Sequence, residues 1–170
     1  MPKKKNGQTQ KRKIGRHIIT ALVENHFGVL AHVSGLFSAR GFNIASLAVG
    51  ETEDPTVSRM TIVVEADDRT LEQVKKQLNR LIDVIKVVEL TGKDFIDREL
   101  ILVKVKISSK TRAEIIQIVD VFDAKIVQAT DQTITIEATG DQQKTQAFLE
   151  LLEKYGIAEV VRTGRIAMER

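Results

Sequence analysis

The hydrophobic positions of residues 17–90 alternate between the two-residue period of β-strands and the three- and four-residue spacing of amphipathic helices. Met60, Ile62 and Val64 alternate with Arg59, Thr61 and Glu65, as expected of a sheet with one helix-covered face and one wetter face. Val29, Val33 and Leu36 recur at helical spacing. The pattern predicts strands at 17–24, 43–51, 57–66 and 83–90, and helices at 29–40 and 68–80. The Asp67-Asp68 pair stands where the second helix should begin, which suits N-capping.

The same order of elements returns after the connector Thr91-Gly92-Lys93-Asp94. Here the pattern predicts strands at 98–107, 124–130, 133–139 and 157–164, and helices at 110–122 and 141–154. Two βαββαβ series in one chain indicate an α+β fold of two tandem ferredoxin-like units. The predicted division is a tail at 1–16, a first unit at 17–90, a linker at 91–97 and a second unit at 98–170.

Charge is distributed unevenly between the tail and the rest of the chain. The first 16 residues hold seven basic side chains and no acidic one, whereas the remainder holds 19 basic and 23 acidic side chains, a net charge of −4. Such a polar, basic segment cannot bury enough apolar surface to order itself, so the tail is expected to be disordered. An alternative function for the chain is therefore a stand-alone nucleic-acid-binding module that uses this basic tail.

The aromatic residues argue against specific nucleic-acid recognition. A ferredoxin-like RNA reader stacks bases on aromatic side chains of its central strands. Here Phe37, Phe122 and Phe148 occupy positions on predicted helix faces, and Phe42 follows a glycine turn, so a core role is favoured for each. We therefore expect no specific nucleic-acid partner.

Composition also limits enzymatic chemistry. The chain has no Cys, and its three histidines, His17, His26 and His32, lack the spacing of a metal site or catalytic triad. No glycine-rich phosphate loop of standard spacing is present. An independent enzyme is thus the weakest of the functional classes, and we expect neither catalytic residues nor a metal site. Without a signal peptide or a membrane-length apolar run, the sequence predicts a cytoplasmic protein that contacts no membrane.

The segment Glu24-Asn25-His26-Phe27-Gly28-Val29-Leu30 joins a predicted strand to a predicted helix. The first N–H groups of a helix lack intrahelical partners and carry the positive end of its dipole, so a carboxylate is well served there. Gly28 leaves room for such a ligand, and the amide of Asn25 offers both a donor and an acceptor. The alternative is structural: Asn25 as an N-cap and Gly28 as a turn residue.

The motifs Asn25–Leu30, Gly35–Ser38, Arg40–Ile44 and Ser58–Thr61 resemble those of the small regulatory subunits of acetolactate synthase. Lys76-Gln77-Leu78, Asp83-Val84 and Arg98–Lys104 extend the resemblance into the second half. In that family the first unit is an ACT domain, a βαββαβ module that pairs with its own copy and holds an amino acid between the copies.

This resemblance implies a homodimer that binds valine or a related branched-chain amino acid and regulates a large catalytic subunit. It places the effector at Gly28, Val29 and Leu30, with Asn25 holding a polar group and Asn43 and Ile44 reaching it from the paired subunit. It also implies that this chain carries no cofactor, since thiamine diphosphate, Mg²⁺ and FAD belong to the large subunit. The implied function is therefore to activate the catalytic subunit and to confer feedback inhibition by valine on branched-chain amino-acid synthesis, without catalysis by this chain.

Overall fold

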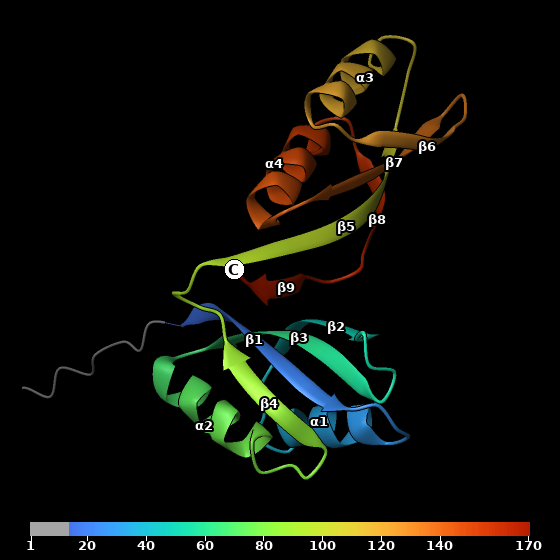
Figure 1. Ribbon diagram of the computed structural model, residues 1–170. Helices are drawn as coiled ribbons and strands as arrows, with labels where there is room; N and C mark the ends of the chain where they lie inside the picture. Colours follow the sequence, from blue (N-terminus) through green and yellow to red (C-terminus); the bar gives the residue numbers. More distant parts are fainter. Residues whose placement is uncertain (1–13) are drawn as a thin grey trace, which may run out of the picture.

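The first half of the chain forms a four-stranded antiparallel sheet covered on one face by two helices (Figure 1). The computed structural model describes residues 14–170. The elements are β1 (Gly15–Glu24), α1 (Val29–Ser38), β2 (Ile44–Glu51), β3 (Val57–Ala66), α2 (Asp68–Leu78) and β4 (Val84–Glu89). The strand order is β2-β3-β1-β4, so β2 and β4 are the edges. This arrangement places the β1–α1 loop and the start of β4 at one end of the sheet, because β1 and β4 are antiparallel neighbours.

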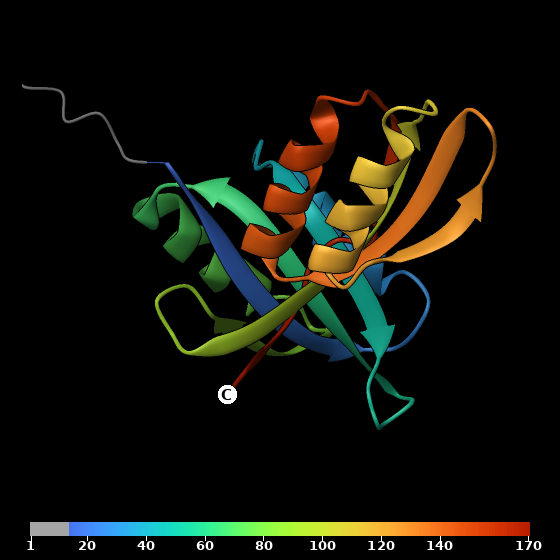
Figure 2. The same ribbon diagram turned by 90° about the horizontal axis from the view of Figure 1, so that it is seen from above.

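The second half repeats this plan. Its elements are β5 (Phe95–Lys106), α3 (Arg112–Val121), β6 (Lys125–Ala129), β7 (Thr133–Gly140), α4 (Gln142–Glu153) and β8 (Ile157–Arg162), with strand order β6-β7-β5-β8. Seen from above, α3 and α4 lie side by side over this unit (Figure 2). The predicted α+β fold of two tandem ferredoxin-like units is confirmed.

Each unit buries its own core between sheet and helices. The first core includes Ile19, Ile62 and Phe37, and the second includes Ile101, Ile136 and Phe148. Phe122 packs against Phe148 with ring centroids 5.2 Å apart, and Phe42 meets Phe37 edge-on at 6.4 Å. The core role predicted for these four aromatic rings is therefore confirmed, and none is free to stack on a base.

Aspartate caps start two of the helices. The carboxylate of Asp67 accepts a hydrogen bond from the Thr70 backbone N–H at 2.8 Å, and Asp141 accepts one from Lys144 at 2.8 Å. The capping role predicted at the start of the second helix is thus confirmed for Asp67. No helix within residues 14–170 is long and apolar enough to cross a lipid bilayer.

A thirteenth element, β9 (Ile166–Glu169), was not predicted. It pairs antiparallel with Phe95–Arg98 at the start of β5. Residues 95–97, assigned above to the linker, therefore belong to β5. The prediction missed them because their hydrogen-bonding partner lies some 70 residues further along the chain and leaves no local signal. The predicted tail is also too long: Gly15 and Arg16 belong to β1, paired with Ala66 and Glu65, and residues 1–13 lie outside the described part of the chain.

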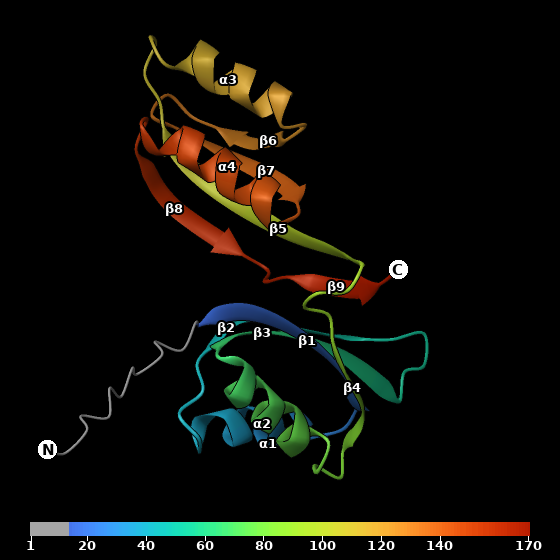
Figure 3. The same cartoon turned by 90° about the vertical axis from the view of Figure 1, so that its left-hand side faces the viewer.

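The strand β9 lies between the two units and joins them (Figure 3). A small third core forms there from Ile18 and Val63 of the first sheet, Leu90 of the connector and Ala167 of β9. Side-chain hydroxyls of the first sheet accept from the backbone near β9: Ser46 from Arg165 at 3.1 Å and Thr61 from Ala167 at 3.4 Å. The two units are therefore held by apolar contact and by specific hydrogen bonds, and we call this region the joint.

Gly164 provides a test of the joint. Its φ is +81°, and a Cβ atom there would lie 2.8 Å from Ser46 Oγ and 3.3 Å from the Leu47 carbonyl oxygen. We predict that Gly164→Ala lowers the free energy of unfolding by about 1–3 kcal/mol, since it adds backbone strain and a contact with main chain that cannot move aside. Urea denaturation measures this change.

The matched control is Gly50→Ala in β2, where no heavy atom lies within 4 Å of the added methyl. Its effect should stay within about 0.5 kcal/mol, as for an ordinary surface substitution. Equal stability of the two variants would contradict a close approach of Gly164 to β2.

Candidate functional site

The loop between β1 and α1 turns at Gly28. This residue occupies the N-cap position of α1 with φ 91° and ψ −16°, a left-handed conformation that glycine adopts without strain. No heavy atom lies within 4 Å of the position that a Cβ would take. The glycine is thus required by the backbone conformation and also leaves open space in front of the helix.

The first turn of α1 presents unpaired backbone donors. Among residues 14–170, no acceptor receives the N–H groups of Gly28, Leu30 or Ala31, whereas the Val29 N–H donates a long hydrogen bond of 3.5 Å to the His26 carbonyl. The turn also has no acidic side chain. Because such N–H groups sit at the positive end of the helix dipole, the loop offers a small anion several donors at once.

Asn25 does not cap the helix, so that part of the structural alternative is wrong, whereas its other part, Gly28 as a turn residue, is confirmed. Its amide nitrogen donates to the Pro55 carbonyl at 2.8 Å and to Glu51 Oε1 at 3.1 Å. These bonds tie the loop to the turn between β2 and β3. In the described part of the chain no donor approaches Asn25 Oδ1, which leaves that oxygen for a ligand donor.

The six residues predicted at the effector site fall into two groups. Asn25, Gly28, Val29 and Leu30 lie together at the start of α1. Val29 is buried in the core and Leu30 is half-exposed, so the first offers a ligand only its main chain and the second an apolar side chain.

Asn43 and Ile44 follow the other end of this ten-residue helix, which is about 15 Å long. Asn43 is exposed, whereas Ile44 packs on the first core. One chain therefore does not bring the two groups together, and a site containing both needs a second chain.

A polar cluster beside this loop was missed by sequence reasoning. Asp83, which precedes β4, is buried, and its two oxygens meet two histidines: Oδ1 lies 3.2 Å from His26 Nε2, and Oδ2 lies 2.8 Å from His32 Nδ1. Glu24 Oε2 also lies 3.2 Å from His26 Nε2. The histidine spacing carried no motif, because the residue that joins the two rings comes from more than fifty positions away.

The cluster shifts two pKa values in opposite directions. The Phe27 carbonyl beside Nδ1, followed by the negative charges of Asp83 and Glu24, raises the pKa of His26. The hydrogen bond from His32, followed by the charge of His26, lowers the pKa of Asp83. The folded chain therefore favours a charged pair of His26 and Asp83.

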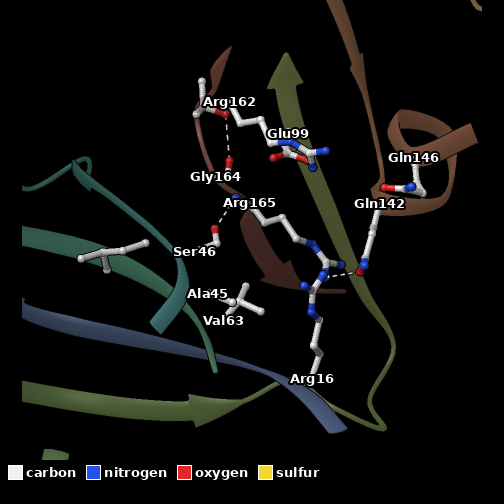
Figure 4. A pocket seen from close by; sticks show the side chains of 12 residues that line it. Arg16, Ala45, Ser46, Val63, Glu99, Gln142, Gln146, Arg162, Gly164 and Arg165 are labelled. Carbon is white, nitrogen blue, oxygen red and sulfur yellow. Dashed lines mark hydrogen bonds and ion pairs between the residues drawn. The ribbon is translucent and has the colours of Figure 1, made fainter. Parts of the chain in front are cut away.

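The joint contains a second candidate, a cavity of about 490 Å³ shown in Figure 4. Its cationic side chains already have partners within the chain. Arg165 Nε is 2.9 Å from Asp97 Oδ2 and its Nη1 donates to Gln142 at 2.8 Å, while Arg162 lies 3.5 Å from Glu99. The third arginine of the lining, Arg16, lies with its Nε 3.0 Å from Glu65 Oε1. Because all three arginines are paired with carboxylates of the chain, we interpret this cavity as part of the joint rather than as an anion site.

Comparison with known proteins agrees with the fold. Residues 19–86 match the family model described as the AHAS small subunit-like ACT domain. The chain is therefore a protein with an ACT domain in its first unit. Residues 98–170 match a second model, described as the small subunit of acetolactate synthase.

Curated relatives match over nearly the whole chain. A probable acetolactate synthase small subunit of Methanothermobacter thermautotrophicus is 53% identical over 91% of this chain and 92% of its own length. The acetolactate synthase small subunit of Mycolicibacterium smegmatis is 51% identical, covering 91% of both. The crystal structure of the small subunit from Thermotoga maritima superposes with a TM-score of 0.83 at 40% identity, covering 92% of this chain and 98% of that one. The chain belongs to the family of acetolactate synthase small subunits, the regulatory rather than catalytic subunits.

The charged pair predicts a pH-dependent contribution to stability. Because the pKa of His26 is raised on folding, its contribution is complete below the ordinary histidine value, about 6.5, and is lost as pH rises through the folded pKa. Asp83 has a lowered pKa, so it stays ionised across this range and its own contribution is lost only in acid. In metal-free buffer, Asp83→Asn should destabilise the chain more near pH 5.5 than near pH 8.5.

Urea unfolding at the two pH values gives the stability difference, and NMR titration of the His26 ring gives its pKa, which should fall in Asp83→Asn. The control is Glu53→Gln, an exposed carboxylate in the β2–β3 turn, which should leave both quantities unchanged. An unaltered His26 titration in Asp83→Asn would show that the two groups do not interact.

Proposed function

We propose that this chain activates a large, catalytic subunit of acetolactate synthase and makes it subject to feedback inhibition by valine or a related branched-chain amino acid. The observation that carries the proposal is the set of unpaired N–H groups at Gly28 and the first turn of α1. The name of the relatives supports the proposal of a catalytic partner, since a small subunit implies a large one. The catalytic subunit would carry thiamine diphosphate, Mg²⁺ and FAD, and this chain would supply regulation only.

An amino acid needs three kinds of contact, and the loop offers each of them. The carboxylate would accept from the N–H groups of Gly28 and of the first turn. The ammonium would donate to Asn25 Oδ1, and an apolar side chain would lie against the half-exposed Leu30. A small branched-chain ligand therefore fits both the polar and the apolar part of this site.

The second group of predicted residues supports a site shared between two copies. Asn43 and Ile44 lie beyond the far end of α1, too far to reach the loop of their own chain, and Ile44 begins β2, an edge strand with a free row of backbone groups. A two-fold dimer would bring Asn43 of one copy to the loop of the other and would create two equal sites.

Gly28→Asp tests the position of the effector carboxylate. The new carboxylate would occupy the open space before α1 and repel the ligand, so inhibition by valine should be lost. Activation should persist, since a ligand acts only through its differential affinity for the two states of the complex. The measurement is acetolactate formation by the reconstituted complex across a valine titration.

The matched control is Gly92→Asp, which also replaces a glycine of positive φ with open space around it, but in the connector between the units. This variant should keep its inhibition. Full inhibition of the Gly28→Asp complex would place the effector site elsewhere.

Complementation between variants tests whether the site is shared. Alone, Asn43→Ala should weaken valine binding by about 1–3 kcal/mol, since it leaves a ligand group unpaired. In a mixed dimer of Gly28→Asp and Asn43→Ala chains, one shared site carries both defects and the other carries neither. Calorimetry should therefore find one site of native affinity per mixed dimer. If Asn43 served its own chain, neither site would be native.

A further inference from the structure

Three potential metal ligands converge beside the effector loop, from parts of the chain that are far apart in sequence. Glu24 ends β1, His26 lies in the loop, and Asp83 precedes β4. His26 Nε2 is 3.2 Å from both Glu24 Oε2 and Asp83 Oδ1, and the three ligand atoms lie within 4.8 Å of one another. No motif signals this group in the sequence.

The hydrogen bond at the other ring nitrogen fixes the tautomer of His26. Its Nδ1 lies 3.0 Å from the Phe27 carbonyl oxygen, which can only accept, so Nδ1 carries the hydrogen. In the neutral ring Nε2 therefore presents a lone pair to two carboxylate oxygens. This contact is repulsive unless a cation lies at Nε2, and that cation is either a proton or a metal ion.

The spacing of the ligand atoms also suits a metal ion at this position. Two ligand atoms bound tetrahedrally to Zn²⁺ at about 2.1 Å lie about 3.4 Å apart, close to the two distances of 3.2 Å seen here. A histidine that binds zinc typically donates its second N–H to a carbonyl or carboxylate, as His26 does. His32, at 2.8 Å from the other oxygen of Asp83, orients that carboxylate.

From this geometry we propose that Glu24, His26 and Asp83 bind one divalent ion of the zinc class per chain. Nitrogen and carboxylate ligands suit Zn²⁺ and Co²⁺. The side chains of Glu24 and His26 are about half exposed, at 55% and 49%, so the ion can enter and keep water in its remaining positions. The bound ion would link the end of β1, the effector loop and the start of β4. The proposal does not depend on the proposed effector.

Metal binding is measured directly on the full chain after it has been stripped of metal. Co²⁺ is followed by its visible absorption and Zn²⁺ by calorimetry, near pH 7.5. We expect one equivalent per chain and a cobalt spectrum of low coordination number. Glu24→Gln and His26→Ala each remove a ligand from an exposed position, so they should keep the native circular dichroism and weaken binding at least about 100-fold.

Two further variants sharpen the test. His32→Ala removes only the residue that orients Asp83, so it should weaken binding by about tenfold. Glu53→Gln removes an exposed carboxylate of the same unit and should leave binding unchanged. Absence of cobalt binding by the native chain would show that only a proton occupies the position at Nε2. Native affinity in both Glu24→Gln and His26→Ala would also overturn the proposal.

Discussion

The central β-strands of the first sheet are apolar on both faces, and this constraint determines how the two halves of the chain are assembled. Ile19 and Ile62 face the helices, whereas Ile18 and Val63 face away from them into the third core. A sheet with two apolar faces needs a layer on each side. The helices α1 and α2 supply one layer, and β9 with the start of β5 supplies part of the other (Figure 3). The second unit is thus held against the first by burial of apolar surface, and the hydrogen bonds that Ser46 and Thr61 accept from the backbone near β9 add direction to that contact.

The loop between β1 and α1 is supported by elements from across the first sheet. Asn25 ties it to the turn between β2 and β3, and His26 ties it to Asp83 at the start of β4. Gly28 holds the left-handed turn that directs the first N–H groups of α1 outward. A ligand bound at these groups would contact a loop whose position depends on three strands, which is a physical route from a small molecule to the sheet.

The sequence predicted the elements and the tandem fold well, because local periodicity records which face of each element is buried. Met60, Ile62 and Val64 are buried, as their alternation indicated, and Asp67 caps the helix it precedes. The wetter face expected on the other side is wrong at Thr61 and Val63, which are buried because β9 and the third core cover them. The start of α1 was also predicted correctly, so Gly28 was expected at the N-terminus of this helix, where the structure places it.

Long-range contacts were beyond such reasoning. The pairing of β9 with β5 and the meeting of His26 and His32 at Asp83 both join residues more than fifty positions apart. Asn25 illustrates the same limit at shorter range, since its type suggested a helix cap and its actual partners belong to a neighbouring turn. The separation of Asn43 from the loop follows from the length of α1, but the second copy that it calls for is a proposal.

The pairing of β9 with β5 also has a consequence for the order of folding. Each unit already closes a long-range pair of its own, Ile19 with Glu89 across 70 positions and Ile101 with Arg162 across 61, and β9 pairs Phe95 with Glu169 across 74. Closing a long loop costs entropy before any contact repays it, so distant pairings form late. The third core of the joint takes Ile18 and Val63 from the first sheet and Ala167 from β9, so it can form only after both partners are in place.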